Sequence, residues 1–374
     1  MTISPRTSGS GSPGPRRRGA TQALTAFAAA LLGAGALTAC GSSGGSAGAG
    51  GDGPSVVAST NVYADIVEQV AGGNATVEAV ISDPAADPHS YEASPADAAK
   101  VSNADLVVYN GGGYDSFVDL ALENAGEVPV VRAVDEYSAV TGEAAPEHSH
   151  DHGDDAGGSH DGHDHGDDDG HGDESNDEGQ GGHAGHDHSH DAASNEHVWF
   201  SLPTTTAVAE QVASQLAEID PEHADDYRAN ARSFGDALTP VQAQLDEIHD
   251  RGHFPYAQTE RIGAHLLDYA HMVDRTPRGF LTSVEDDTDP SAADLASLID
   301  LLDRQEVAVL AYNPQTETAV TARVREAAVN GGVVVVEISE TLPEGTDYVT
   351  WMSGIVNELA DALAGAAPVD DDEH

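Results

Sequence analysis

The histidines of this 374-residue chain are concentrated in one acidic tract. Residues 147–191 contain eleven of its 19 histidines, and most of the other residues there are Asp and Gly. The eleven are His148, His150, His152, His160, His163, His165, His171, His183, His186, His188 and His190. Imidazole nitrogens and carboxylate oxygens bind borderline divalent cations such as zinc. Because the tract has no apolar periodicity, we predict that it is disordered and holds several ions weakly.

Two further histidines flank this tract, each in a segment whose composition is typical of ordered structure. His89 follows a proline in the upstream run DPHSYE, and His197 opens the downstream run HVWF. The neighbouring Pro88 restricts the backbone around His89. A disordered metal-binding tract between two such histidines indicates a folded metal site beside it.

The elements that would position these histidines follow an alternation of strands and helices. Apolar runs typical of buried strands alternate with helical patterns, which favours parallel sheets covered by helices. Strands are predicted at 56–58, 77–81, 106–109, 128–131, 307–312 and 333–338. Helices are predicted at 64–71, 94–101, 116–124, 265–271, 290–302, 316–329 and 346–363.

Residues 204–251 carry helical patterns at 204–219 and 221–251 and nothing typical of a strand, and Pro240 is expected to kink or divide the second pattern. The prediction is therefore an α/β fold of two lobes, each a mainly parallel sheet flanked by helices, joined by a long helical connection. A ligand cleft is expected between the lobes, where strand ends meet. The predicted parts are an N-terminal lobe (56–203, containing the tract 147–191), connecting helices (204–251), a C-terminal lobe (252–365) and an acidic tail (366–374).

The first residues resemble an export signal for a lipoprotein. Three arginines at 16–18 precede a small, apolar stretch at 20–37, which is short for a membrane span of ~20 strongly apolar residues. The sequence Leu-Thr-Ala-Cys at 37–40 has the pattern of a lipobox. We predict a signal peptide (1–39), lipidation of Cys40, a Gly/Ser-rich tether (40–55) and anchoring to the outer face of the cell membrane. Sec and twin-arginine export both remain open.

The net charge and the cysteine content argue against certain binding partners and certain kinds of metal site. The net charge is −50, and without residues 1–39 it becomes −54, from 11 basic and 65 acidic residues. Such a chain is not expected to bind nucleic acid, which requires clustered Lys and Arg. Cys40 is the only cysteine, so neither an intrachain disulfide nor a thiolate metal site is expected. His223, His249, His253 and His271 are expected to be polar helix or loop residues.

Four segments of the chain carry a family resemblance. They are DPHSYEASPADAAKVSNADLVVYNGGGYDSF (87–117), EHVWFS (196–201), YNPQTETAVT (312–321) and SETLPEGTDYVTWM (339–352). These segments resemble those of the substrate-binding lipoproteins of zinc and manganese ABC importers. The resemblance extends over residues 56–363. It implies two α/β lobes, a connecting helix and a buried site with four metal ligands.

The resemblance also implies which residues bind the metal. The first two ligands of the family correspond to His89 and His197. The third, which is His in zinc-type members and Glu in many manganese-type members, corresponds to Glu260. His265 stands where the family usually has a Tyr, so His265 is an alternative third ligand. The fourth ligand is usually Asp, and Glu340 occupies its place here.

The function that this resemblance implies is capture of a divalent metal outside the cell and its delivery to an ABC transporter permease, by a monomeric protein that is not an enzyme. Two carboxylates favour manganese, whereas the histidine tract favours zinc, which we predict as the metal. One alternative is an extracellular metal buffer or metal-dependent adhesin. Another is a metallohydrolase, which would need an open coordination position and a general base, and no HExxH-type spacing supports it.

Overall fold

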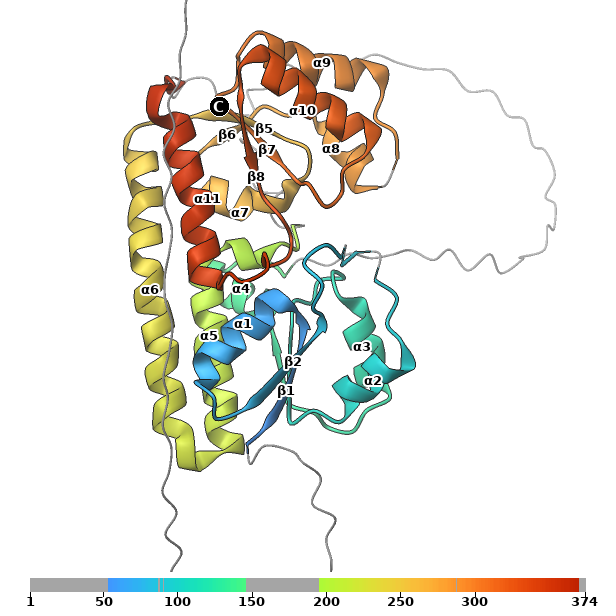
Figure 1. Ribbon diagram of the computed structural model, residues 1–374, viewed down its shortest axis with the longest axis vertical. Helices are drawn as coiled ribbons and strands as arrows, with labels where there is room; N and C mark the ends of the chain where they lie inside the picture. The colour runs from blue at the N-terminus through green and yellow to red at the C-terminus, as the bar shows by residue number, and fades with distance from the viewer. Residues whose placement is uncertain (1–52, 87, 90, 146–194, 287, 370–374) are drawn as a thin grey trace, which may run out of the picture. The chain divides into compact units, whose positions relative to one another are not determined.

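Two four-stranded parallel sheets, each flanked by helices, form the framework of the protein (Figure 1). The computed structural model describes residues 53–86, 88–89, 91–145, 195–286 and 288–369. The N-terminal sheet has the order β2-β1-β3-β4, and its strands are β1 (Ser55–Thr60), β2 (Thr76–Ile81), β3 (Leu106–Tyr109) and β4 (Val130–Arg132). The C-terminal sheet has the order β6-β5-β7-β8, and its strands are β5 (Pro255–Gln258), β6 (Val273–Asp274), β7 (Val309–Tyr312) and β8 (Val334–Glu337).

Helices connect the strands and join the two sheets. Those of the N-terminal lobe are α1 (Asn61–Ala71), α2 (Pro95–Ser102), α3 (Ser116–Glu123) and α4 (Ala133–Thr141). The helices between the sheets are the 3-10 turn η2 (Val198–Phe200), α5 (Leu202–Ile219), η3 (Pro221–His223) and α6 (Ala224–Asp250). The rest are η4 (Arg261–Gly263), α7 (Ala264–Tyr269), α8 (Arg278–Glu285), α9 (Ala292–Asp303), α10 (Ala319–Gly331), α11 (Tyr348–Ala362) and η5 (Leu363–Gly365). This arrangement confirms the predicted two-lobed α/β fold.

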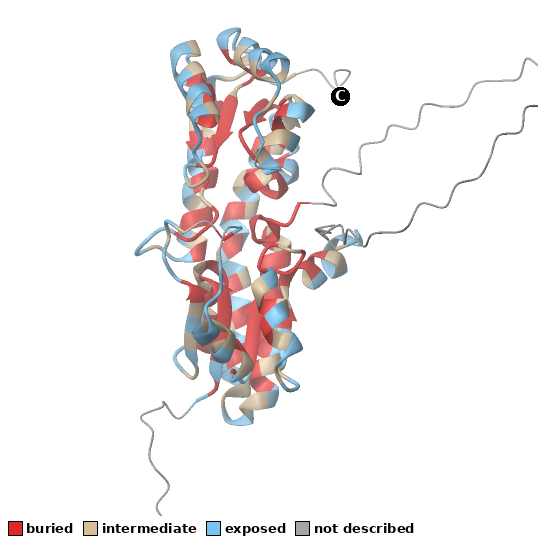
Figure 2. Ribbon diagram, turned by 90° about the vertical axis from the view of Figure 1, so that its right-hand side faces the viewer, coloured by how far each residue is buried: buried red, intermediate tan, exposed pale blue. Residues whose placement is uncertain are grey.

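The central strands of each sheet, β1 and β3 in one and β5 and β7 in the other, are buried on both faces (Figure 2). In β1, Val56 and Ala58 face a large core that includes side chains of α1 and α5, whereas Val57 faces a smaller core formed with α2 and α3. The C-terminal sheet repeats the pattern in β7, where Val309 belongs to the large core and Leu310 to a third core with α9 and α10. Alternate side chains of one strand therefore fix helices on opposite faces.

Helix α6 is a single 27-residue element that continues through Pro240, so of the two predicted effects of this proline, a kink or a division, the division does not occur. A proline inside a helix costs ~3 kcal/mol. Here Leu238, Val241 and Leu245 are buried on both sides of it, and α6 packs against α5, α1 and α11. Burial of each such side chain contributes roughly 1.5–3 kcal/mol, which outweighs the lost backbone hydrogen bond.

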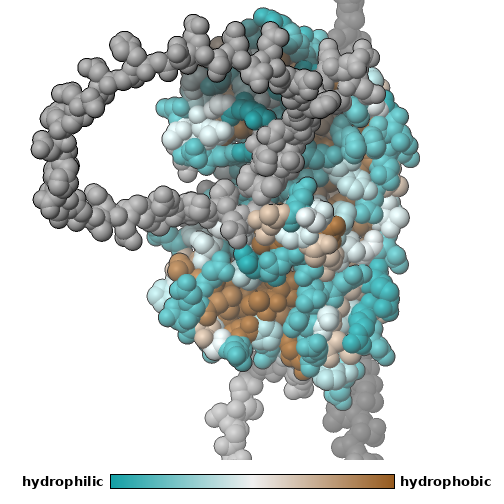
Figure 3. Space-filling view, turned by 180° about the vertical axis from the view of Figure 1, so that it is seen from behind, coloured by the Kyte–Doolittle hydropathy of each residue, from teal (hydrophilic) through white to brown (hydrophobic). Residues whose placement is uncertain are grey.

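Seen from behind, the C-terminal lobe is mostly hydrophilic, while an apolar patch lies on the N-terminal lobe (Figure 3). Among the described residues, none of the helices is both long enough and apolar enough to cross a membrane.

Candidate metal centre

The residues singled out as ligands lie in loops at the ends of secondary-structure elements. His89 lies in the loop after β2, and His197 immediately precedes η2. Glu260 follows β5, and Glu340 follows β8. The carboxyl ends of parallel strands share one edge of a sheet, so side chains that follow different strands converge there.

The structure brings these four side chains together. One ligand atom from each of His89, His197, Glu260 and Glu340 lies within 4.8 Å of the others. The exposed fractions of Glu340, His197 and Glu260 are 0%, 4% and 7%. The His89 side chain is 35% exposed, and its Nε2 atom lies 3.4 Å from Glu340 Oε2. His89 is therefore the member of the group that faces solvent.

Asn195 orients the imidazole of His197. The side-chain oxygen of Asn195 lies 2.7 Å from His197 Nδ1 and accepts the backbone N–H of His197 at 3.1 Å. The Asn195 amide group donates in turn to the carbonyl of Arg261 at 2.8 Å, which fixes which end of the Asn195 side chain faces His197. Because the oxygen accepts, Nδ1 of His197 carries the proton, and Nε2 is the nitrogen that can bind a metal.

Asn313 holds the two carboxylates next to each other. Its Nδ2 atom donates to Glu260 Oε2 and to Glu340 Oε1, each at 2.9 Å. The Thr316 hydroxyl also donates to Glu260 Oε2 at 2.7 Å. Burial raises the pKa of Glu260, while the hydrogen bonds from Thr316 and Asn313 and the nearby His89 lower it in part. Two buried carboxylates this close repel each other, and a divalent cation removes that repulsion.

Side chains of the C-terminal lobe hold the loop that leads to His89. Gln315 donates from Nε2 to the carbonyls of Pro84 at 3.1 Å and Ala86 at 3.2 Å. The hydroxyl of Thr341, next to Glu340, also donates to the Pro84 carbonyl, at 2.8 Å. Ligand-bearing loops of the two lobes are thus tied to each other directly.

His265, the alternative third ligand, lies outside the group of four. It is buried, and its Nε2 atom lies 2.9 Å from the carbonyl oxygen of Asn195. Burial lowers the pKa of His265, so the ring is neutral and donates from Nε2 to that carbonyl. His265 therefore supports the segment that orients His197, whereas the carboxylate of Glu260 faces the other three candidate ligands.

Other parts of the prediction lie beyond what the structure describes. Cys40 and the eleven histidines between 148 and 190 fall outside the described residues. Conversely, sequence reasoning did not single out Asn195, Asn313 or Thr316. All three stand within or beside the segments that carry the family resemblance, but nothing in those segments marks them as residues that support the ligands.

A two-lobed α/β protein whose lobes together surround two imidazoles and two carboxylates belongs to the class of metal-binding solute receptors. The chain belongs to the family described as zinc-uptake complex component A, periplasmic, whose model matches residues 56–362. Members of this family are metal-binding substrate-binding components of ABC transporters.

Curated relatives carry the names of different metals. The chain is 26% identical over 315 residues to the manganese-binding lipoprotein MntA of Bacillus subtilis, covering 83% of this chain and 87% of the relative. It is 23% identical over 258 residues to the zinc-binding lipoprotein AdcA of Streptococcus pneumoniae, covering 68% of this chain and 44% of the relative.

Solved structures share the fold. The substrate-binding protein FpvC of Pseudomonas aeruginosa, solved with Mn²⁺, superimposes with a TM-score of 0.60 at 17% identity, over 84% of this chain and all of that chain. The laminin-binding adhesin Lmb of Streptococcus agalactiae has the same TM-score and identity, over 83% of this chain and 100% of that chain.

Proposed function

We propose that this protein captures zinc outside the cell and delivers it to an ABC transporter permease. The ion would bind through His89, His197, Glu260 and Glu340. The observation that carries the proposal is the convergence of these four side chains, three of them buried, from both lobes within 4.8 Å. Two neutral imidazoles and two carboxylates balance the charge of a divalent ion and complete a four-coordinate site.

Four protein ligands favour carriage over catalysis. A catalytic zinc site usually keeps one position for water or substrate, whereas a site with four protein ligands is closed. The supporting hydrogen bonds from Asn195 to His197 and from Asn313 to both carboxylates are the kind that fix ligand orientation. A binding protein that releases its ion to a permease needs ligands of fixed orientation, but it does not need a metal-bound water that can react.

The preference for zinc rests on residues of this chain, because the relatives are named for manganese, zinc and iron. The centre itself, with two carboxylates, suits either zinc or manganese. The eleven histidines of the tract favour zinc, because imidazole binds zinc more strongly than manganese in the usual order of affinities. A tract of weak zinc ligands would raise the local zinc concentration beside the centre.

The predicted location of the protein follows from its first residues. We propose that residues 1–39 are removed, that Cys40 is lipidated, and that residues 40–55 tether the folded part to the outer face of the membrane. This arrangement keeps the receptor close to its permease, and the protein acts as a monomer.

The test is metal uptake by host cells that lack the gene. Cells with the intact gene should accumulate radioactive zinc at low external concentration, and cells carrying both His89→Ala and Glu340→Ala should not. Glu337→Gln, a change of an exposed glutamate in β8, is the matched control and should restore uptake. Unchanged zinc uptake in the deletion strain would contradict transport and favour an extracellular buffer or adhesin. A response to manganese alone would contradict the choice of metal.

A further inference from the structure

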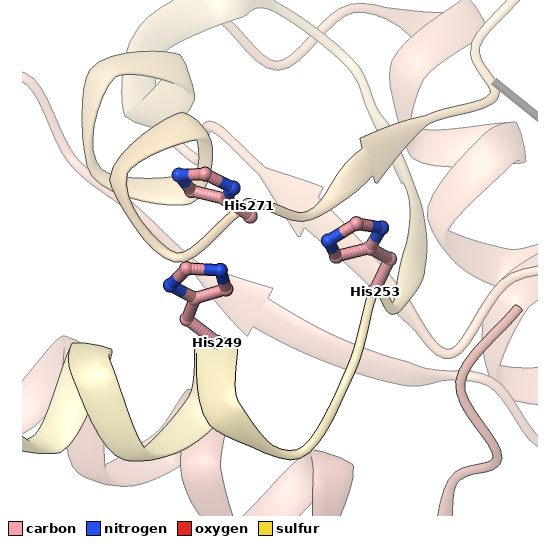
Figure 4. Close-up of side chains that lie close together, drawn as sticks. All are labelled: His249, His253 and His271. Atoms are coloured by element: carbon pink, nitrogen blue, oxygen red, sulfur yellow. The ribbon is translucent and has the colours of Figure 1, made fainter. Parts of the chain in front are cut away.

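Three histidines of the C-terminal lobe form a second cluster. His249 lies in the last turn of α6, His253 lies two residues before β5, and His271 lies between α7 and β6 (Figure 4). One ring nitrogen from each lies within 4.8 Å of the others. The rings of His249 and His271 are stacked with centroids 3.9 Å apart, and the His253 ring lies 6.3 Å from that of His249 and 6.1 Å from that of His271.

The register of the sheet explains why His253 and His271 meet. Pro255 in β5 pairs with Val273 in the parallel strand β6. His253 and His271 each precede their strand by two residues, so the same register brings them side by side. They lie at the amino end of β5, whereas Glu260 follows its carboxyl end. Seven residues of extended chain span on the order of 20 Å, so this cluster is separate from the metal centre.

A tight turn brings His249 to the same place. Gly252 has a φ of +115°, and its N–H donates to the carbonyl of His249 at 2.9 Å. The chain then enters β5, and the carbonyl of His253 accepts the N–H of Val369 at 2.7 Å. A Cβ atom at position 252 would lie 2.7 Å from Pro368 Cβ, so only glycine fits this turn.

His271 occupies a backbone position that usually belongs to glycine. It has a φ of +52°, in the left-handed region. The N–H of His271 donates to the carbonyl of Asp268 at 2.9 Å, and the N–H of Met272 donates to that of Leu267 at 3.0 Å. These two bonds form the Schellman motif that ends α7, in which glycine is the preferred residue at the left-handed position. A histidine here is unfavourable for the backbone, which points to a role for its side chain.

We propose that His249, His253 and His271 form a second metal site for a borderline divalent cation, such as zinc or copper(II), with water in the remaining position. The cluster offers three imidazoles and no carboxylate, and such donors discriminate against manganese. Two of the rings are half-buried and His271 is exposed, so an ion can reach them from solvent.

Formation of the site requires only side-chain movement. Zinc–nitrogen bonds of 2.0–2.1 Å at tetrahedral angles place ligand nitrogens about 3.3 Å apart. The ring nitrogens now lie within 4.8 Å of one another. Rotation about the side-chain bonds of these partly exposed rings would bring them to the shorter separation. The bound ion would tie the end of α6 to the edge of the C-terminal sheet formed by β5 and β6. This role is independent of capture at the metal centre.

The experiment is chemical footprinting of histidines in the intact mature protein without an affinity tag. The protein is treated with diethylpyrocarbonate with and without zinc, and modification of each histidine is followed by mass spectrometry. Zinc at ten times the dissociation constant leaves about one molecule in eleven unbound, so modification of His249, His253 and His271 should slow about tenfold. Manganese should not protect them. His223, at the start of α6 and paired with Asp220, is the control and should keep its reactivity.

Two variants distinguish a shared site from separate effects. His271→Gly removes one ligand while fitting the left-handed backbone, so the variant should fold and should lose zinc protection of His249 and His253. Protection of His89, the ligand of the other centre that faces solvent, should persist in this variant. His253→Gln should likewise abolish protection of His249. The proposal is overturned if zinc protects none of the three in the wild-type protein, or if either variant keeps the full protection of the remaining histidines.

Discussion

Glu340→Gln should weaken metal binding and strengthen the metal-free fold at the same time. Glutamine has nearly the same shape as glutamate and keeps an oxygen that can accept the hydrogen bond from Asn313. The change therefore removes a negative charge and one metal-binding oxygen without opening a cavity. If Glu340 stabilised the metal-free fold, the change would lower the free energy of unfolding of the metal-free protein. If Glu340 serves to bind the ion, the change should raise it.

The stability effect follows from the distance between the two carboxylates. Ligand oxygens of Glu260 and Glu340 lie within 4.8 Å of each other. At an effective dielectric constant near 20, two unit charges at that separation repel by about 3 kcal/mol. Protonation of Glu260, whose pKa is raised by burial, relieves part of this repulsion. We therefore expect the free energy of unfolding of the metal-free variant to rise by roughly 1–3 kcal/mol at neutral pH.

The affinity effect has the opposite sign. Loss of a residue that merely supports a metal ligand typically costs 10–100-fold in affinity, so replacing a ligand itself should cost at least about that much. This corresponds to roughly 1.4–2.7 kcal/mol of binding free energy. Metal binding relieves the repulsion between the two carboxylates only in the wild-type protein, because the variant has one of them. The binding free energy is therefore more favourable for the wild type than for the variant.

Urea unfolding of chelator-treated protein and calorimetric zinc titration measure the two effects. Both should be done with residues 147–191 deleted, so that the tract does not contribute to the titration. Glu337→Gln, which changes an exposed glutamate at the end of β8, three residues before Glu340, should alter neither quantity appreciably. A variant that is less stable without metal, yet binds zinc as tightly as wild type, would refute the reasoning and make Glu340 a structural residue.

Four further predictions concern other parts of the chain. Cys40→Ser should release the protein into the medium or leave its signal uncleaved, as judged by fractionation and mass spectrometry. Deletion of residues 147–191 should leave one tight zinc site in calorimetry but impair growth when zinc is scarce, and ion binding by the tract should fade as pH falls through about 6, because imidazole binds metal only when neutral. His265→Ala should keep tight zinc binding, with a loss of at most about tenfold through the loosened His197 segment. Burial raises the pKa of Asp115 from 3.8 to about 6, so this group adds stability below about pH 4 that is lost as pH rises through 6, on the order of 3 kcal/mol relative to Asp115→Asn in urea unfolding.

Each of these expectations has an outcome that contradicts it. Normal processing and membrane attachment of the Cys40→Ser protein would disprove the lipobox. Loss of all tight binding on deletion of the tract would make the tract the primary site. Loss of tight binding in His265→Ala alone, with Glu260→Ala unaffected, would transfer the third ligand to His265. Parallel pH profiles for wild type and Asp115→Asn would show that this carboxyl has the same pKa in the folded and unfolded chain.

The fold was predictable where a strand is buried on both faces and therefore reads as a continuous apolar run. Strand β3, with the sequence LVVY, and β7, with VLAY, are examples. Strand β5 was not predicted, because its sequence PYAQ begins with proline and ends with a polar residue, although all four residues are buried. Strand β6 has two residues and is defined by its pairing with β5 rather than by its own sequence.

The candidate site was predictable to the extent that residue type signals metal binding. His89 and His197 could be singled out because histidine flanking a metal-binding tract is informative by itself. Glu260 and Glu340 needed the resemblance to a family, because glutamate is common in so acidic a chain. Asn313 carries no such signal, and its contacts with the two glutamates join residues 53 and 27 positions apart, which only the folded structure reveals.

The cluster of His249, His253 and His271 shows the same limit. From the sequence these residues were expected to be ordinary polar positions. Their proximity depends on the turn at Gly252 and on the register between β5 and β6, and neither can be deduced from local composition. Long-range strand pairing therefore determines sites that a search for motifs does not find.

The most direct test of the central claim is anomalous diffraction at the zinc absorption edge from crystals of the zinc-loaded protein. We predict one strongly occupied ion about 2.0–2.2 Å from a ring nitrogen of each of His89 and His197 and from a carboxylate oxygen of each of Glu260 and Glu340. An ion bound by His265 in place of Glu260, or the absence of any ion among these four side chains while zinc is present elsewhere, would contradict the account.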